Sequence, residues 1–470
     1  MPSNVILIAS GIATTYVFLR CLLAFTQDAK EPPALETAIP FLSPMIGMRK
    51  KAKFYIDLRL YIINSTELIP AAQKQVRILD FAPMESKVAI NVMGSGPEGK
   101  KVLLRSEEGV GDYAYAILFD KAIHASVSPG PQLDAMNKSS VEIVARSVEE
   151  LASRSPARLK LFERFEPGII IMLLNLYPNL LARDSVQARR EIVDAFNDYF
   201  VSHAHEEGSA FVQSHYQHKI DQGVTGKDVA RFEIGAIVGI LSNTIPASFW
   251  VLYHTFSDPT VLEECRKEIL ACCKVEGNTC TLDIAEVKAS CSILLSILKE
   301  SLRFHGIGTS VRVVTQDHLL DGKYLLKKGG IVMIPGPVQH SSTLAYGEDV
   351  DRFEHMRFVR SPTRKRPSPI AFRGFGGGAT LCPGRHFATT EILTFVAVII
   401  ARFDFKPVRS EWVCPKTDKA GMAGTIAPPN LDEDVEVEVT PTAGEMAGKI
   451  WNVVLSASDK GVELSAEDIR

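Results

Sequence analysis

The residue whose setting most clearly indicates chemistry is Cys382, in the segment Phe375-Gly-Gly-Gly-Ala-Thr-Leu-Cys382-Pro-Gly-Arg385. Three consecutive glycines can adopt positive φ and let the backbone lie close to a flat ligand, because no side chain intervenes. Pro383 and a long apolar stretch follow, so the sulfur is expected at a helix N-terminus, which favours a thiolate. A thiolate is a suitable axial ligand for haem iron. The alternative is a glycine-rich turn whose cysteine only caps the helix.

A second candidate group is the charged pair Glu300 and Arg303, one helical turn apart. The same Glu-x-x-Arg spacing recurs at 263/266, 354/357 and 467/470, so a solvated surface pair is the alternative. The helix expected over 287–304 is largely apolar, however, and charges there need a buried partner. Arg357, 25 residues before Cys382, is the candidate partner. We expect Glu300, Arg303 and Arg357 to play a structural role, holding the cysteine loop in place.

The elements that must position these residues are mainly helical. Residues 140–305 have helical patterning, and a capping-box-like start at Thr225 predicts a long helix ending at Ser257, before Asp258-Pro259. Further helices are expected over 287–304 and 383–403. Strand patterns at 311–314, 319–326 and 331–334, with an Asp321-Gly322 turn, predict a β patch. The sequence therefore predicts a mainly α fold with a small β-rich side region.

Composition excludes several classes of protein. The chain has 470 residues, 46% of them hydrophobic and 23% charged, which is ordinary globular usage. Fifty-two basic and 55 acidic side chains give a formal charge of −3, so no basic field exists to bind nucleic acid. The eight cysteines form no CxxC pair or regular spacing, which disfavours a zinc cluster and a disulfide framework. A reducing compartment fits this usage.

The N-terminus predicts a membrane anchor. Of the 21 residues from Val5 to Phe25, 16 are apolar, and a helix of this length spans roughly 31 Å, enough to cross a bilayer. Its charge, Arg20, lies near the C-terminal end, where it can snorkel. A cleaved signal peptide is the alternative, but the first four residues carry no basic side chain. We expect an anchor at 1–27, a proline-rich hinge at 28–46, and, from the basic residues at 49–53, a cytosolic body at 47–470.

With these motifs in place, the sequence resembles the cytochrome P450 superfamily of haem-thiolate monooxygenases, over nearly the whole chain. The anchor, proline hinge, long central helix, Glu-x-x-Arg helix, Phe-x-x-x-Arg-Phe segment and cysteine loop follow in family order. The resemblance implies the P450 fold and haem b, with Cys382 as the iron ligand. It implies that further residues bind the cofactor, namely Phe375, Gly378, Gly384, Arg312 and Arg385, and that Glu300, Arg303 and Arg357 form the structural triad of the fold.

The chain departs from the family pattern at the haem propionates. Two residues before the cysteine the family usually has a basic residue, and here Thr380 stands there. No Trp-x-x-x-Arg motif matches an early helix. One propionate partner is therefore either missing or has moved to Arg385 or Arg373. Arg312 and His340 fall where the family often places others, and an ordinary strand-end arginine and a satisfied histidine are the alternatives.

The long helix departs from the pattern as well. Ser242 and Asn243 stand where an acid and a threonine are usual, and the segment to Trp250 is similar to the corresponding helix of cholesterol 7α-hydroxylase and prostacyclin synthase. Pro246 has no N–H for the carbonyl of Ser242, so we expect a kink there. That carbonyl, the Asn243 amide and the Thr244 hydroxyl can host a water chain for proton delivery, which makes these three the expected catalytic residues. The alternative is a kinked core helix with mutually satisfied polar groups.

The resemblance implies insertion of one oxygen atom of O2 into a hydrophobic small molecule, with electrons from NADPH through NADPH–cytochrome P450 reductase. The segments around Lys327 and His386 are similar to those of filamentous-fungal members, which suggests tailoring of terpenoids, polyketides or alkaloids. The expected location is the endoplasmic reticulum membrane, single-pass, with the catalytic domain facing the cytosol. Two alternatives stay open: an isomerase or dehydratase that needs no external electrons, because of Asn243, and a non-catalytic haem or lipid binder.

Overall fold

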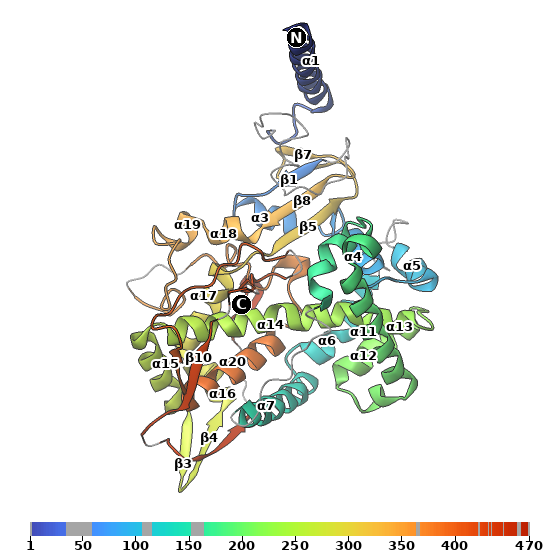
Figure 1. The fold of residues 1–470 in the computed structure, drawn as a ribbon. Helices are drawn as coiled ribbons and strands as arrows, with labels where there is room; N and C mark the ends of the chain where they lie inside the picture. Colours follow the sequence, from blue (N-terminus) through green and yellow to red (C-terminus); the bar gives the residue numbers. More distant parts are fainter. Residues whose placement is uncertain are drawn as a thin grey trace. The chain divides into compact units, whose positions relative to one another are not determined.

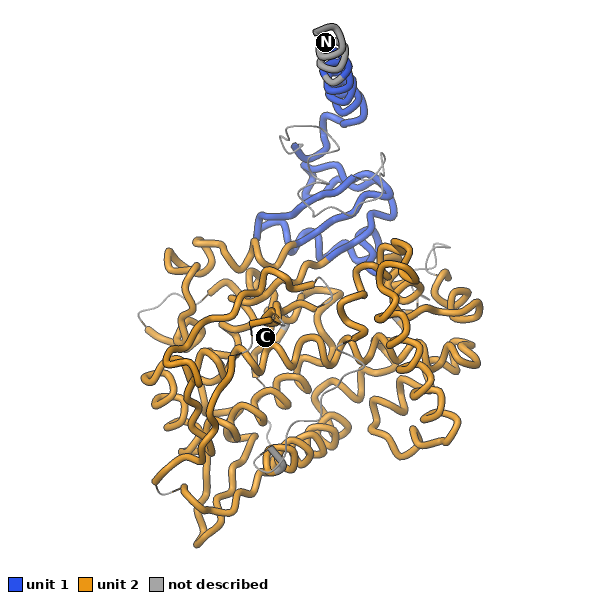
Figure 2. The backbone as a smooth tube through the Cα atoms, viewed as in Figure 1, with its two compact units in different colours: residues 1–81, 311–334 blue, residues 82–310, 335–470 orange. Residues whose placement is uncertain are grey.

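The structure is a computed structural model. It describes residues 2–33, 59–105, 115–151, 164–362, 367–421, 424–430, 432–433, 435–444, 446–457 and 462–468. These residues group into two compact units (Figure 2). One comprises residues 1–81 and 311–334, and the other residues 82–310 and 335–470. Most of the expected hinge at 28–46 and the basic residues at 49–53 lie outside the described residues.

The smaller unit carries the predicted β patch. A four-stranded sheet has the order β1 (Leu60–Ile62), β8 (Ile331–Pro335), β5 (Thr309–Val314), β2 (Leu79–Asp80), with β1 parallel to β8 and β2 antiparallel to β5. A hairpin pairs β6 (His318–Leu320) with β7 (Tyr324–Leu326). Its turn is the predicted one, because Asp321 and Gly322 both have positive φ, 53° and 67°. The unit also holds helices α1 (Pro2–Thr26) and α3 (Leu68–Gln73).

The larger unit is mainly helical, as predicted (Figure 1). Its α-helices are α4 (Ala82–Val92), α5 (Pro97–Leu104), α6 (Tyr115–Val127), α7 (Pro131–Leu151), α9 (Ile169–Leu173), α10 (Pro178–Leu181), α11 (Arg183–Val201), α12 (Ala210–Asp221), α13 (Asp228–Arg231), α14 (Glu233–Phe256), α15 (Pro259–Ala271), α16 (Ile284–Ser290), α17 (Ser292–Phe304), α18 (Gly336–His340), α19 (Thr343–Tyr346) and α20 (Arg385–Arg402). Short 3-10 turns are η2 (Glu166–Gly168), η3 (Ala204–Glu207), η4 (Gly378–Thr380) and η5 (Ala466–Asp468).

Two small sheets lie in the same unit. Strand β9 (Phe403–Pro407) pairs antiparallel with β10 (Val437–Pro441). Strand β4 (Thr279–Asp283) is antiparallel to β3 (Cys273–Glu276) and parallel to β11 (Ile450–Val454). The hairpin β3–β4 lies within the region 140–305, for which the sequence pattern predicts mostly helix. Gly277, with φ of 57°, allows its tight turn.

The core of the larger unit is built around α20. Nearly every residue from Ile392 to Ala401 is buried, so this helix is apolar on all sides and is enclosed by other helices. α14, α15, α16 and α7 all contact it, and Figure 1 shows α14 crossing the unit beside it. Val251 of α14 and Leu294 of α17, both fully buried, belong to the same hydrophobic cluster. This packing places the long helix α14 and the start of α20 in one rigid framework.

Two predicted helices have different bounds in the structure. The helix expected from Thr225 begins later, because Gly226 has φ of 57°, and it is divided at Phe232 into α13 and α14. The helix expected over 287–304 is divided at Cys291 into α16 and α17. The carboxylate of Glu268, from α15, accepts the N–H of Ile293 (2.9 Å) and so supplies the first turn of α17 with a distant cap. Such long-range capping leaves no local sequence signal.

Two apolar helices bear on the membrane prediction. Residues 228–256, which form α13 and α14, are long and apolar enough to span a bilayer. Residues of α14 belong, however, to the hydrophobic core of the larger unit. The predicted anchor forms α1, and its segment Ala13–Thr26 is the shorter apolar helix of the described chain. α1 has 25 residues, which corresponds to about 38 Å. The anchor function of α1 stays a prediction.

Candidate functional site

The Cys382 loop is a tight, hydrogen-bonded turn. The N–H of Cys382 donates to the carbonyl of Phe375 (2.9 Å), and the N–H of Leu381 donates to that of Gly378 (3.1 Å). Gly376 and Gly378 have φ of 78° and 60°, values that favour glycine. A Cβ on Gly376 would lie 2.6 Å from the carbonyl oxygen of Thr380. The glycines are therefore needed to close the loop on itself, and the loop fixes the cysteine backbone.

The sulfur itself sits just before α20 rather than in its first turn. α20 starts at Arg385 with Gly384 as its N-cap, so Pro383 lies outside the helix. Burial raises the pKa of the Cys382 thiol, although the Gly384 N–H and the Arg385 charge oppose the rise. The expected thiolate stays a prediction, and a cation at the sulfur, such as haem iron, would favour it.

The middle of α14 is more open than its C-terminal half, although the helix belongs to the core. Ile240 and Ile245 are 39% and 53% exposed, whereas Trp250 and Val251 are fully buried. A Cβ on Gly239 would meet no atom within 4 Å. The helix face around Gly239 thus has open space beside it. A large flat apolar group can lie against such a face.

Of the three expected catalytic residues, Asn243 shares this face, because it lies one turn after Gly239 in α14. α14 continues through Pro246, and the Thr244 hydroxyl donates to the carbonyl of Ile240 (2.7 Å). The side-chain oxygen of Asn243 accepts from the N–H (2.7 Å) and the hydroxyl (3.0 Å) of Thr425. The Ser242 hydroxyl is buried and has no hydrogen-bond partner among the described residues. Asn243 therefore holds a neighbouring loop, and Ser242 keeps an unused polar atom.

That loop, residues 424–427, was not identified from the sequence. Besides Thr425, its Ala427 carbonyl accepts the indole N–H of Trp250 (2.7 Å), and its backbone pairs with His305 and Ile307. It connects α14 with the end of α17. Sequence reasoning missed Thr425 because it lies 182 residues from Asn243 and in no motif.

The structure brings Glu300, Arg303 and Arg357 together as one buried network. All three side chains are 3% exposed or less. Arg303 donates to both carboxylate oxygens of Glu300 (2.7 Å each), and Arg357 donates to one of them (2.9 Å). The remaining guanidinium N–H groups donate to backbone carbonyls of residues 340–352 and to Asp349. The network ties α17 to the segment that precedes the cysteine loop.

The expected propionate partners have other contacts. Arg312, in the smaller unit, is buried and lies over the ring of Phe81. Arg385 pairs with Asp468 (2.7 Å) and donates to the carbonyl of Cys382 (3.3 Å). His340 accepts the N–H of Arg373 (2.9 Å), and burial lowers its pKa to about 3, so it is neutral. Their roles toward a propionate stay predictions.

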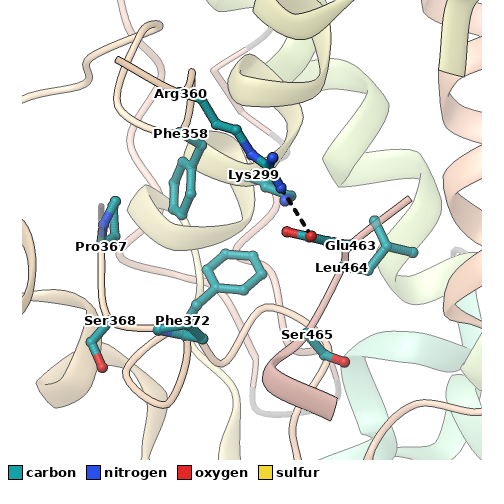
Figure 3. A pocket seen from close by; sticks show the side chains of 10 residues that line it. Lys299, Phe358, Arg360, Pro367, Ser368, Phe372, Glu463, Leu464 and Ser465 are labelled. Carbon is teal, nitrogen blue, oxygen red and sulfur yellow. Dashed lines mark hydrogen bonds and ion pairs between the residues drawn. The ribbon is translucent and has the colours of Figure 1, made fainter. Parts of the chain in front are cut away.

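The guanidinium of Arg373 packs against the loop, 2.4 Å from where a Cβ of Gly377 would stand. Thr380, in the place of the usual basic residue, lies 3.4 Å from the hydroxyl of Ser310. The pocket in Figure 3 lies elsewhere, between Lys299, Phe358, Phe372 and Leu464, and contains no residue of α14 and no part of the Cys382 turn. We do not assign that pocket to the cofactor.

The residues present fit a haem. The donor is a soft, reduced sulfur that forms no disulfide, and it is held by a loop whose glycines keep side chains away. A second requirement, a helix face with free space, is met by α14 around Gly239. Phe375, partly buried, packs against the main core cluster and anchors the loop. The site thus offers an iron ligand and an open helix face within one helical unit.

Comparison with known proteins decides the family. The family model "Cytochrome P450" matches residues 147–431. The chain is 31% identical over 464 residues to "Cytochrome P450 monooxygenase nodJ" of Hypoxylon pulicicidum, covering 86% of this chain and 88% of that protein. This chain belongs to the cytochrome P450 family. Like these relatives, it is a P450 monooxygenase, and the predicted membership is confirmed.

Two shorter similarities point to subgroups of the family. The P450 is 27% identical over 248 residues to "Cytochrome P450 monooxygenase poxD" of Penicillium oxalicum, covering 52% of this chain and 51% of that protein. It is 29% identical over 209 residues to "Cholesterol 7-alpha-monooxygenase" of Cricetulus griseus, covering 41% of each. The relatives thus include fungal monooxygenases and a sterol-oxidising enzyme. Family membership implies a haem with a cysteine thiolate ligand.

Proposed function

We propose that this P450 inserts one oxygen atom from O2 into a C–H or C=C bond of a hydrophobic small molecule, as a tailoring step of fungal secondary metabolism. The observation that carries the proposal is the Cys382 loop, which is closed by Gly376 and Gly378 and lies in the same unit as the open space beside Gly239 of α14. The similarity to nodJ over most of both chains supports the fungal class. The substrate is proposed only as a lipophilic molecule.

The residues have distinct roles in this proposal. Cys382 holds haem b by its thiolate, and the bound haem supplies the activation of O2. Phe375, Gly378 and Gly384 shape the loop around the sulfur, and Arg312 is proposed to lie toward a propionate. Arg385 is proposed to act on the cofactor through its hydrogen bond to the Cys382 carbonyl. The buried Glu300 network keeps the segment before the loop fixed, because its arginines bind backbone carbonyls over residues 340–352.

Proton delivery is proposed to run along α14. Pro246 leaves the Ser242 carbonyl without its helical N–H, and the buried Ser242 hydroxyl has no partner among the described residues. Since Thr425 occupies the side-chain oxygen of Asn243, the Asn243 amide N–H is the group left to donate to water. The Thr244 hydroxyl donates to the Ile240 carbonyl, and its oxygen can still accept a hydrogen bond. Ordered water between these groups would carry protons to the oxygen-binding face.

Electrons are proposed to come from NADPH through NADPH–cytochrome P450 reductase, in the endoplasmic reticulum membrane. α1 is the proposed single-pass anchor, with the catalytic domain in the cytosol. A second surface supports membrane contact in the larger unit: Leu174, Tyr177, Leu180 and Leu181 are 46–79% exposed within eight residues. Large apolar side chains gathered in this way are typical of a lipid or protein contact.

The test separates monooxygenation from the isomerase alternative. The purified full chain is mixed with NADPH–cytochrome P450 reductase and NADPH under carbon monoxide, without oxygen. We expect the reductase to reduce the haem, seen as growth of the long-wavelength Soret band. A chain that the reductase cannot reduce, but that rearranges an organic peroxide, would contradict the proposal. Incorporation of ¹⁸O from O2 into progesterone, used as a lipophilic probe, would exclude a non-catalytic binder.

A further inference from the structure

The C-terminal segment 462–468 packs on the cysteine side of the larger unit. Leu464 and Ser465 are 2% and 7% exposed, although they follow the last strand and belong to no sheet. Figure 3 shows Leu464, Ser465 and Glu463 against the side chains of Phe372 and Lys299. The segment therefore packs against residues just ahead of the cysteine loop.

The last described residue of the segment, Asp468, has a carboxylate that accepts several hydrogen bonds. Asp468 accepts from the guanidinium of Arg385 (2.7 Å), the hydroxyl of Ser465 (2.9 Å) and the N–H of Leu464 (3.0 Å). Burial alone would raise the pKa of Asp468, but these hydrogen bonds and the Arg385 charge hold it below its usual value. His386 lies 3.9 Å away and is neutral at pH 7, because burial and Arg385 lower its pKa. The carboxylate is thus a fixed negative charge.

Arg385 connects this carboxylate to the cysteine. It is the first residue of α20, three residues after Cys382, and its guanidinium also donates to the Cys382 carbonyl (3.3 Å). The side chains of Arg385 and Asp468 are only 17% and 12% exposed, so solvent screens the pair weakly. The guanidinium is held between the iron-ligand peptide and the C-terminal acid.

A second ion pair in the segment lies at the protein surface. Glu463 accepts from Arg360 (3.0 Å), whose side chain is 79% exposed (Figure 3). The described ion pair of Glu463 is with Arg360 and not with a residue of the Cys382 loop. This pair attaches the same segment, but at the surface. It provides a matched control for a change of one negative charge.

We infer that Asp468 is a positioning residue for the iron ligand: it orients Arg385 against the Cys382 peptide and neutralises its charge, and so sets the reduction potential of the haem. This inference rests on ligation by Cys382. Reduction adds one electron at the iron, and nearby positive charge favours that change while negative charge opposes it. An unbalanced Arg385 would therefore raise the potential, and an unbalanced Asp468 would lower it.

The test is a charge cycle read by spectroelectrochemistry on the purified, full-length haem protein. Asp468→Asn is expected to shift the potential to more positive values and Arg385→Gln to more negative values. The double variant is expected to return close to the wild type, and Asp468→Glu to retain the wild-type value. Glu463→Gln, the same charge change in the same segment, is expected to leave the potential unchanged. A purely structural role would not give shifts of opposite sign that cancel.

Three outcomes overturn the inference. Shifts of the same sign in Asp468→Asn and Arg385→Gln would contradict it, as would equal shifts in Asp468→Asn and Glu463→Gln. An unchanged potential in Asp468→Asn would contradict it as well. If one of the two single variants loses its haem, the sign of the shift in the other, compared with the unchanged Glu463→Gln, still decides. A wild-type protein without a thiolate spectrum would contradict the proposed function itself, which separates the two failures.

Discussion

At the residue scale, the structure gives Asn243 a task that the sequence did not indicate. The sequence suggested an amide that hosts water, and the structure shows its oxygen engaged by two donors of Thr425. The loop 424–427 is thereby held along α14, next to the unpartnered Ser242 hydroxyl. The amide N–H and the loop position both affect where water can stand. Asn243 thus links the fold of the loop to the proposed proton path.

Replacing Asn243 by alanine is expected to reduce the coupling of NADPH use to product, because it removes the amide donor and releases Thr425. The lost hydrogen bonds cost about 1–3 kcal/mol. The measurement is the ratio of product formed to NADPH consumed with the reductase. Thr425→Val, which keeps the backbone N–H, is the control and should change the ratio less. Equal coupling in the wild type and Asn243→Ala would contradict the proposed water chain.

Glu300 is a second residue for which burial determines the effect of a substitution on stability. Its two arginine partners are buried with it, so removal of the carboxylate leaves two positive charges uncompensated. We expect Glu300→Gln to destabilise the fold by about 3–5 kcal/mol and to reduce haem retention. Thermal unfolding and the haem-to-protein absorbance ratio measure this. Glu263→Gln, at the exposed copy of the same spacing, should stay within about 0.5 kcal/mol of the wild type. Similar losses in both variants would be inconsistent with this network.

At the element scale, the cysteine loop is defined by backbone geometry that the sequence does signal. The run of glycines predicted positive φ, and Gly376 and Gly378 have it. The sequence did not indicate that the pKa of the Cys382 thiol is raised, because the burial that raises it depends on the packing of distant elements. The same is true of the break at Cys291 and the hairpin β3–β4, which follow from tertiary contacts. The local motifs could thus be predicted from the sequence, whereas the long-range contacts could not.

The loop geometry predicts a sharp difference between two glycine variants. Gly376→Ala would put a Cβ 2.6 Å from a backbone oxygen at a φ of 78°, with a cost on the order of 1–3 kcal/mol. Gly384→Ala meets no atom within 4 Å at a φ of −82°. We expect the first variant to lose much of the long-wavelength carbon monoxide band and the second to keep it. A band of equal size in both would contradict the described loop.

A buried network between α12 and α14 predicts a pH dependence of stability. Burial alone would raise the pKa of Glu233, but His215 and Lys219 more than offset this and lower it to about 2. Lys219 is fully buried and also donates to the carbonyl of Val229 (3.2 Å). The stabilising contribution of Glu233 is therefore present above its ordinary value of 4.5 and is lost as the pH falls toward 2.

The matching variant is Glu233→Gln, which leaves Lys219 buried without its counter-charge. At pH 7 we expect a loss of about 3–5 kcal/mol in unfolding free energy. The difference from the wild type should shrink as the pH falls below 4.5, measured by denaturant unfolding of the haem protein. A difference that is constant from pH 7 to 3 would show that the carboxylate charge does not contribute.

At the scale of the whole molecule, most of the family assignment was available from the sequence. The order of its motifs predicted the P450 family, and the match over 147–431 together with the 31% identity to a fungal monooxygenase confirms it. The C-terminal acid could not be found in that way, since Asp468 lies 83 residues after Arg385 and in no motif. The anchor, the hinge and the propionate partners remain predictions. The account of function therefore depends on the bond between Cys382 and iron.

The most direct test of that bond is the carbon monoxide difference spectrum of the reduced full-length protein, compared between the wild type and Cys382→Ala. The account predicts a long-wavelength Soret band in the wild type that is absent in the variant. Cys291→Ala, a buried cysteine of the core cluster, is the control and should retain the band. A wild-type protein without bound haem, or a band that persists in Cys382→Ala, would contradict the central claim.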